Sequence, residues 1–131
     1  MTYFSWLLLA ACLVATPAPP RPTQAQVARR FLLDALHANY PAAYRRLAPE
    51  VRAGLPLPAF RAAARRLGQA RGTAIELYQI GAYLGEPPNH TEWFCRFRFA
   101  ADSVQRSPRP LLEVTFRDTA SRQVLGFKLR E

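Results

Sequence analysis

The chain has 131 residues, half of them hydrophobic, which suits one domain with its own core and argues against a disordered chain. Its formal net charge is +9, from 18 basic and 9 acidic residues. The excess is local, because ten arginines and two acidic residues lie in 21–71, whereas eight basic and seven acidic residues lie in 72–131. We therefore expect a basic surface on the first half of the domain only.

The N-terminus has the pattern of a targeting segment. Tyr3 to Ala15 is apolar apart from Ser5, and thirteen residues are too few for the ~20 that a membrane-spanning helix needs. The run matches the apolar region of a secretory signal, although no Lys or Arg precedes it. We expect residues 1–22 to be a signal segment with a Pro-rich spacer, and an exported protein of the periplasm or cell envelope, typical of bacteria.

Two processing routes fit this segment. Leu9-Ala10-Ala11-Cys12 resembles a lipobox, which makes Cys12 a candidate lipidation site and the lipid anchor the chain's membrane attachment. The apolar run continues past the cysteine, however, and the other route is ordinary cleavage near Ala18 or after Ala25. Both stay open at this point.

The sequence pattern of residues 23–68 predicts helices. Thr23 and Gln26 form a capping box, and apolar residues recur at helical spacing from Val27 until the chain reaches Asn39, where we expect the helix to end. A short helix is expected from Pro41 to Leu47. Pro49 and Pro58 stand where a proline can begin a helix, and the last helix should run from Leu57 to Leu67 and stop at Gly68.

After Gly72 the apolar period changes from 3.6 to 2, which indicates strands. Thr73–Leu84 is expected to be one strand, with a bulge near Tyr78–Gln79 or a bend at Gly81 because its two halves are out of phase. Three more strands should follow, with these residues facing the core: Trp93, Cys95, Phe97, Phe99, Leu112, Val114, Phe116, Leu125, Phe127 and Leu129. Helices followed by an antiparallel meander predict a single α+β domain over 23–131, with helices packed on a sheet of about four strands.

The run from Phe31 to Leu47 (Phe-Leu-x-x-Ala-Leu-x-x-Asn-Tyr-x-Ala-Ala-Tyr-x-x-Leu) resembles the opening helices of the nuclear transport factor 2-like superfamily. It is most similar to small exported bacterial members of unknown function. The resemblance implies a cone-shaped, cystatin-like α+β fold with a curved antiparallel sheet. It implies no activity, because the superfamily contains both pocket enzymes and members without known catalysis.

Few residues are candidates for catalysis. Asp34 and His37 can share one side of the first helix as a carboxylate and a general base, but a solvated helix face explains them better. His90 lies in a Pro-Pro-Asn turn, and four other candidates are the tyrosines Tyr40, Tyr44, Tyr78 and Tyr83. We expect no catalytic residue, no metal ligand and no cofactor, since phosphate-loop, nucleophile and zinc patterns do not occur.

Cys95 alternates with core residues, so we expect a buried, unpaired thiol that packs like a small apolar group. On the opposite face of its strand lie Phe94, Arg96 and Arg98, beside outward-facing Glu113, Thr115 and Arg117 of the next strand. Cross-strand charge pairing explains this face. A second interpretation makes Phe94, Arg96 and Arg98 a partner or homodimer surface, with Phe94 as an exposed aromatic.

The preferred hypothesis is a non-catalytic exported envelope domain that binds a protein partner or a small apolar ligand through the open face of the sheet. The alternatives are a small pocket enzyme of the isomerase or dehydratase type and a weak polyanion-binding module. Specific nucleic-acid binding is disfavoured, because export separates the protein from nucleic acid.

Overall fold

The computed structural model describes residues 20–68, 72–85, 91–104 and 106–131. The elements follow in this order: α1 Gln24–Leu36, α2 Tyr40–Arg45, α3 Pro49–Gly54, α4 Leu57–Gly68, β1 Ile75–Leu84, β2 Thr91–Phe99, the 3-10 helix η1 Ala100–Asp102, β3 Leu111–Phe116 and β4 Gly126–Arg130. Of the expected signal segment and Pro-rich spacer, residues 1–22, the first nineteen lie outside the described part of the chain.

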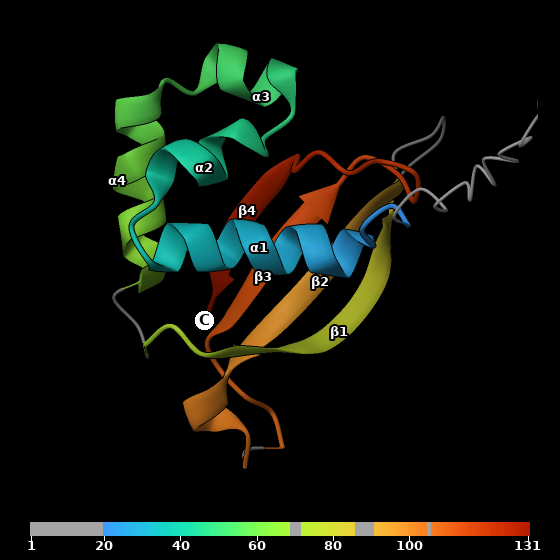
Figure 1. Cartoon of the computed structure of the whole chain (residues 1–131). Helices are drawn as coiled ribbons and strands as arrows, with labels where there is room; N and C mark the ends of the chain where they lie inside the picture. Colours follow the sequence, from blue (N-terminus) through green and yellow to red (C-terminus); the bar gives the residue numbers. More distant parts are fainter. Residues whose placement is uncertain (1–19, 69–71, 86–90, 105) are drawn as a thin grey trace, which may run out of the picture.

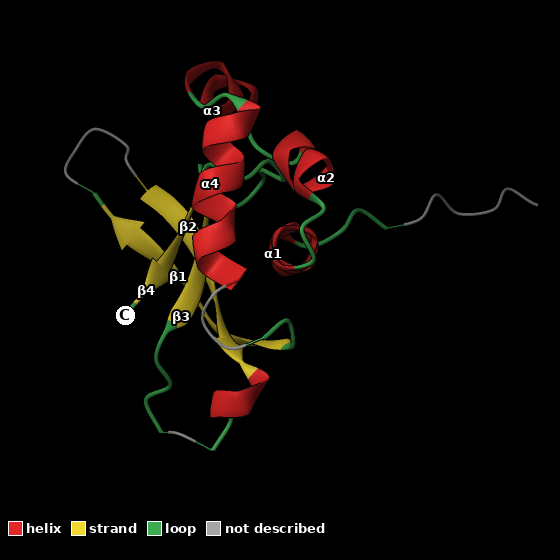
Figure 2. Ribbon diagram, turned by 90° about the vertical axis from the view of Figure 1, so that its left-hand side faces the viewer, coloured by secondary structure: helices red, strands yellow, loops and turns green. Residues whose placement is uncertain are grey.

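The four strands form one curved antiparallel sheet in the order β1-β2-β3-β4 (Figure 1). The helices lie on one side of it, as the view in Figure 2 shows. We call this side the helix-side face of the sheet and the opposite side the outer face. The predicted α+β architecture with helices on one sheet face is confirmed. None of the described helices is long and apolar enough to cross a membrane.

The helix boundaries follow local chemistry. Thr23 and Gln26 form the capping box that begins α1, as predicted. Proline stands in the first turn of α2 and α3, where its missing N–H breaks no helical hydrogen bond. The helix ends at Leu36, shortly before the expected end at Asn39, and Ala38 after it is left-handed, with φ of 62°. Asn39 instead directly precedes α2.

Strand β1 contains the predicted irregularity. Leu77 pairs with Phe97 and Gln79 with Arg96, which leaves Tyr78 as the extra residue of a β-bulge. The bulge brings Ile80, Ala82 and Leu84 onto the same face as Ile75 and Leu77. The two out-of-phase halves of the sequence pattern are reconciled in this way.

The core lies between the helices and strands β2 to β4. Phe31 of α1 and Phe60 of α4 both contact Phe127 of β4, with ring centroids 5.3 and 5.5 Å away. An isolated parallel bridge between Leu47 and Val124 joins the helical layer to the segment before β4. Packed side chains therefore fill this part of the helix-side face, whereas Leu77 and Ile80 on β1 are exposed.

Candidate functional site

In the structure, the side chains of Asp34 and His37 interact with different partners. The Asp34 carboxylate pairs with Arg46, with Nε and Oδ2 3.4 Å apart. The His37 ring lies at the exposed end of α1, and its Nδ1 is 2.7 Å from the carbonyl oxygen of Leu33 one turn back. Each side chain has its own partner, so the two do not form an oriented acid–base pair.

The four candidate tyrosines are scattered. The Tyr44 hydroxyl lies 3.1 and 2.8 Å from the carbonyl oxygens of Arg52 and Leu55, which ties α2 to the end of α3. Tyr40 packs partly buried under the Arg61 guanidinium. Tyr78 is exposed at the β1 bulge. Of the remaining candidates, His90 lies outside the described residues.

Tyr83 belongs to a polar cluster on the outer face that is centred on Glu113. The Tyr83 hydroxyl donates to Glu113 Oε1 at 2.5 Å, and Arg96 Nε donates to the same oxygen at 2.9 Å. Lys128 Nζ is 3.3 Å from Glu113 Oε2, and Arg130 Nη1 is 3.5 Å from Oε1. Cross-strand register produces the cluster, because Arg96 and Lys128 stand directly opposite Glu113 on the two neighbouring strands.

Glu113 lies on the outward face of its strand and pairs across it with Arg96, as predicted, but it is also fully buried, which the sequence did not indicate. The long side chains of Arg96, Lys128 and Arg130 surround the Glu113 carboxylate on that face. Burial by itself would raise the pKa of Glu113, and the hydrogen bonds from Tyr83 and Arg96 with the charge of Lys128 outweigh it and hold the pKa below its ordinary value. A carboxylate held ionised by several cations suits a structural role better than proton transfer.

The candidate partner surface of Phe94, Arg96 and Arg98 lies on this outer face. Phe94 is only 6% exposed, so the expectation of an exposed aromatic is wrong. Its ring lies between the Arg96 guanidinium, 4.1 Å from the centroid, and the ring of Tyr83 at 4.8 Å. Arg98 donates to Glu76 at 2.8 Å. These side chains contact one another and their own sheet, and partner binding by this face stays a prediction.

Cys95 is buried on the helix-side face and is a free thiol, opposite Val114. Burial raises its pKa to about 11, so the thiol is protonated at neutral pH. The predicted structural environment is confirmed. The other cysteine, Cys12, lies outside the described residues.

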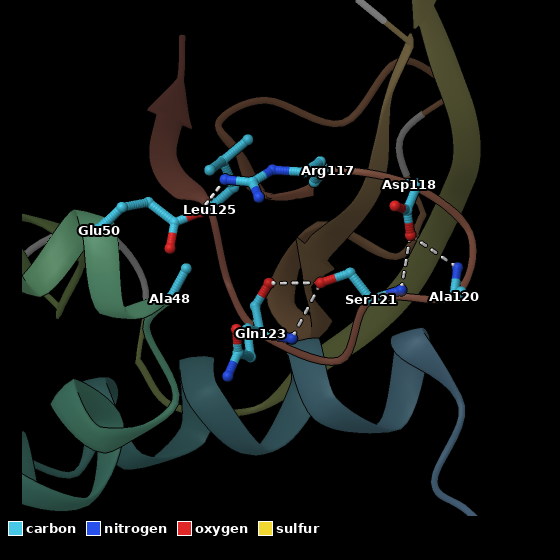
Figure 3. Close-up of a pocket in the computed structure, with 8 residues that line it drawn as sticks. All are labelled: Ala48, Glu50, Arg117, Asp118, Ala120, Ser121, Gln123 and Leu125. Atoms are coloured by element: carbon cyan, nitrogen blue, oxygen red, sulfur yellow. Dashed lines mark hydrogen bonds and ion pairs between the residues drawn. The ribbon is translucent and has the colours of Figure 1, made fainter.

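A pocket of about 300 Å³ lies between the start of α3 and the turn after β3 (Figure 3). Its polar groups have partners: Glu50 pairs with Arg117, and Asp118 Oδ1 accepts hydrogen bonds from the backbone N–H groups of Ala120 and Ser121. The pocket therefore offers no unpaired acid or base. Within the described residues, no three or more His, Cys, Asp or Glu side chains could together hold a metal ion.

The feature that sequence reasoning missed is the surface of β1. Among the described residues, five large hydrophobic side chains are exposed, and four of them belong to this strand. They are Leu77 at 45%, Tyr78 at 41%, Ile80 at 54% and Leu84 at 87%. A signal was present, because the segment from Leu77 to Gly85 carries no charged residue. We call Leu77, Ile80, Ala82 and Leu84 the β1 edge.

None of the protein-family models, curated proteins and solved structures compared with the chain matches it. Function must therefore be inferred from the sheet and its surfaces.

Proposed function

We propose that the protein is a non-catalytic, exported envelope domain that binds a protein partner along β1. The observation that carries the proposal is the concentration of exposed large hydrophobic side chains on this one strand. Soluble proteins usually protect an edge strand with charges, proline or a covering element, and an unprotected one is suited to pairing with another chain.

The location of β1 supports partner binding over a small apolar ligand. The helix-side face of β2 to β4 is filled by the core side chains of α1 and α4, including Phe31, Phe60 and Leu67. A ligand pocket in a small domain is normally a concave, mostly apolar cavity. The β1 edge instead presents a linear apolar strip with backbone groups beside it, which fits an extended polypeptide.

The chemistry of the titratable groups supports a non-catalytic role. A general acid or base needs a position in a cleft and a group free to exchange its proton. Glu113 is enclosed by cations, Asp34 pairs with Arg46, and the Cys95 thiol is buried and protonated. The alternative of a pocket enzyme would have to use residues such as Tyr83 that already bond within the outer face.

Export remains part of this proposal and is supported by the apolar segment before Ala15 and the Pro-rich spacer. The resemblance to the nuclear transport factor 2-like superfamily also stays a proposal, supported by the order of helices before a curved antiparallel sheet.

The weak polyanion-binding alternative is favoured by the arginines of the helical layer. It is compatible with docking through β1, which lies outside that layer.

The experiment is site-specific photo-crosslinking in the native host. A photoreactive amino acid at Leu84, which is 87% exposed on β1, should give adducts with protein, whereas the same residue at Val104, which is 92% exposed after η1, should not. Introducing Ile80→Lys should suppress the Leu84 adducts. Equal labelling from Leu84 and Val104, or none from Leu84, would overturn docking along β1.

A further inference from the structure

The free side of β1 can be assigned from its hydrogen bonds. Ala100 N donates to Ala74 O at 2.9 Å, which makes this pair one of the hydrogen-bonded pairs between the start of β1 and the end of β2. Backbone groups then alternate in direction along the strand, so Ile75 directs its carbonyl away from β2. Arg29 of α1 confirms this, because its Nη1 donates to Ile75 O at 3.0 Å.

Beyond the bulge at Tyr78, the same alternation applies in the shifted register. Gln79, Gly81 and Tyr83 stand opposite β2 residues that are directed at β1. The residues whose N–H and C=O groups point away from the sheet are therefore Ile80, Ala82 and Leu84. Two of these residues, Ile80 and Leu84, also carry exposed large apolar side chains.

Charge favours a second copy of this chain as the occupant. The chain carries +9 overall and the excess lies in residues 21–71, so two copies repel each other most strongly through their helical halves. Residues 72–131 are nearly neutral, and the segment from Leu77 to Gly85 has no charge. Glu76, just before it, is already paired with Arg98. Two copies can therefore approach along this strand with little electrostatic cost.

The strand also limits the register. The bulge at Tyr78 ends regular pairing on one side, and β1 ends at Leu84, next to Gly85. The regular stretch is 79–84, its outward-directed residues are Ile80, Ala82 and Leu84, and Ala82 is the middle one of the three. An antiparallel two-fold pair about Ala82 places outward-directed residues opposite each other, because Ile80 of one copy then faces Leu84 of the second.

We propose that two copies of the protein pair antiparallel through β1, with Ala82 at the two-fold axis and Ile80 opposite Leu84 of the second copy. The pairing joins the two sheets into one of eight strands, with both helical layers on the same side. The inference rests on the proposed function, since it names the partner that the β1 edge binds. Such a short strand pair covers less than the ~1,600 Å² of a standard interface, so the dimer should dissociate on dilution.

The first test is sedimentation equilibrium of the purified protein over a range of concentrations. We expect a reversible monomer–dimer equilibrium, weakened about tenfold or more by Ile80→Lys or Leu84→Lys. Val104→Lys is the matched control, because Val104 is an exposed apolar residue outside β1, and it should leave the equilibrium unchanged. Thermal melts check that each variant stays folded. A monomer at all concentrations, or equal effects of all three substitutions, would overturn the proposal.

The second test is a disulfide at the axis. In the full chain carrying Cys12→Ser, the remaining native thiol is the buried Cys95. Ala82→Cys should give a covalent dimer under mild oxidation, because Cα atoms ~5.5 Å apart in a hydrogen-bonded pair lie within disulfide range. Ala62→Cys, on the exposed side of α4, should stay monomeric. If the Ala82→Cys variant still dimerises reversibly but forms no disulfide between the two copies, this register is refuted.

The two tests separate this inference from the proposed function. A purified chain that stays monomeric, together with Leu84 photo-adducts of another mass in the native host, would overturn the second copy and keep docking along β1. Adducts of twice the chain mass support both. The absence of any Leu84 adduct together with a monomeric chain would overturn both.

Discussion

Gly81 lies against the tip of the Phe94 ring: a Cβ atom at Gly81 would be 2.5 Å from Phe94 Cζ. The two residues stand opposite each other on β1 and β2. The missing side chain leaves room for the tip of the Phe94 ring against β1, and Arg96 and Tyr83 contact the same ring. An aromatic on the outer face thus becomes part of a packed layer.

We expect Gly81→Ala to destabilise the protein by about 1–3 kcal/mol, the usual cost of overpacking a filled site. The ring would have to move away from β1 and would lose its contact with Tyr83. Gly54→Ala is the control, because a Cβ there meets nothing within 4 Å and should be neutral or slightly stabilising. Urea denaturation measures both. Equal stability of the two variants would contradict the close packing at Gly81.

Glu113→Gln should destabilise the protein by about 2 kcal/mol at neutral pH, which is toward the low end for a buried hydrogen-bonded charge because water screens the half-exposed Lys128 and Arg130. The amide removes the charge that balances Arg96. Glu76→Gln is the matched control, since Glu76 also pairs with an arginine but is 44% exposed, and it should change stability less.

The loss of stability caused by Glu113→Gln should depend on pH. Folding lowers the pKa of Glu113 below its ordinary value of 4.5, so the ionised side chain stabilises the fold above that pH. The contribution is lost as the pH falls through the lowered pKa. The difference in unfolding free energy between wild type and Glu113→Gln should therefore be constant near neutrality and shrink in acid. A difference that stays constant down to pH 3 would show that the charge is not responsible.

The sequence was sufficient for the elements and for the faces of the strands. Capping at Thr23, apolar spacing and the phase change at Tyr78 are local signals, and they predicted α1 and the β1 bulge. The burial of Glu113 and Phe94 could not be predicted from local signals of this kind. It depends on which residues the register places across the sheet. The sequence predicted Gly81 only as a possible bend, whereas in the structure this glycine allows a close approach of Phe94.

The exposure of β1 was missed for a related reason. Alternation assigns Ile80, Ala82 and Leu84 to the helix-side face, which is correct, but it does not say how far the helices extend over that face. The helices pack over β2 to β4 and leave much of the edge strand uncovered. The extent of helix coverage is a tertiary property, and it decides where the candidate binding surface lies.

Cys95 should resist thiol reagents in the native protein and react after denaturation. Burial both hides the sulfur and raises its pKa to about 11, so little reactive thiolate forms at neutral pH. Cys95→Ala should cost about 1–2 kcal/mol through the small cavity it leaves. Mass spectrometry after timed labelling measures the reactivity. Rapid labelling of the folded protein would contradict the packing opposite Val114.

Export predicts a shortened mature chain. Mass spectrometry of the native protein should show the loss of at least the first eleven residues, because both cleavage routes remove them. Inhibition of the lipoprotein signal peptidase distinguishes the routes: it should block maturation only if Cys12 is the lipidated residue. Recovery of the intact chain from the cytoplasm would contradict export.

The arginines of the helical layer should give weak, salt-sensitive binding to polyanions. Arg29 and Arg30 on α1 and Arg61, Arg65 and Arg66 on α4 are all exposed, and the groove beside Arg29 and Arg30 has no aromatic side chain among its lining residues for base stacking. We expect retention on heparin that is lost near physiological salt, because each phosphate or sulfate contact releases a counterion. Arg65→Glu with Arg66→Glu should weaken retention, and Arg109→Glu, at an exposed site after η1, should weaken it less. Sub-micromolar binding to single-stranded nucleic acid that survives physiological salt would instead indicate a specific site on this layer.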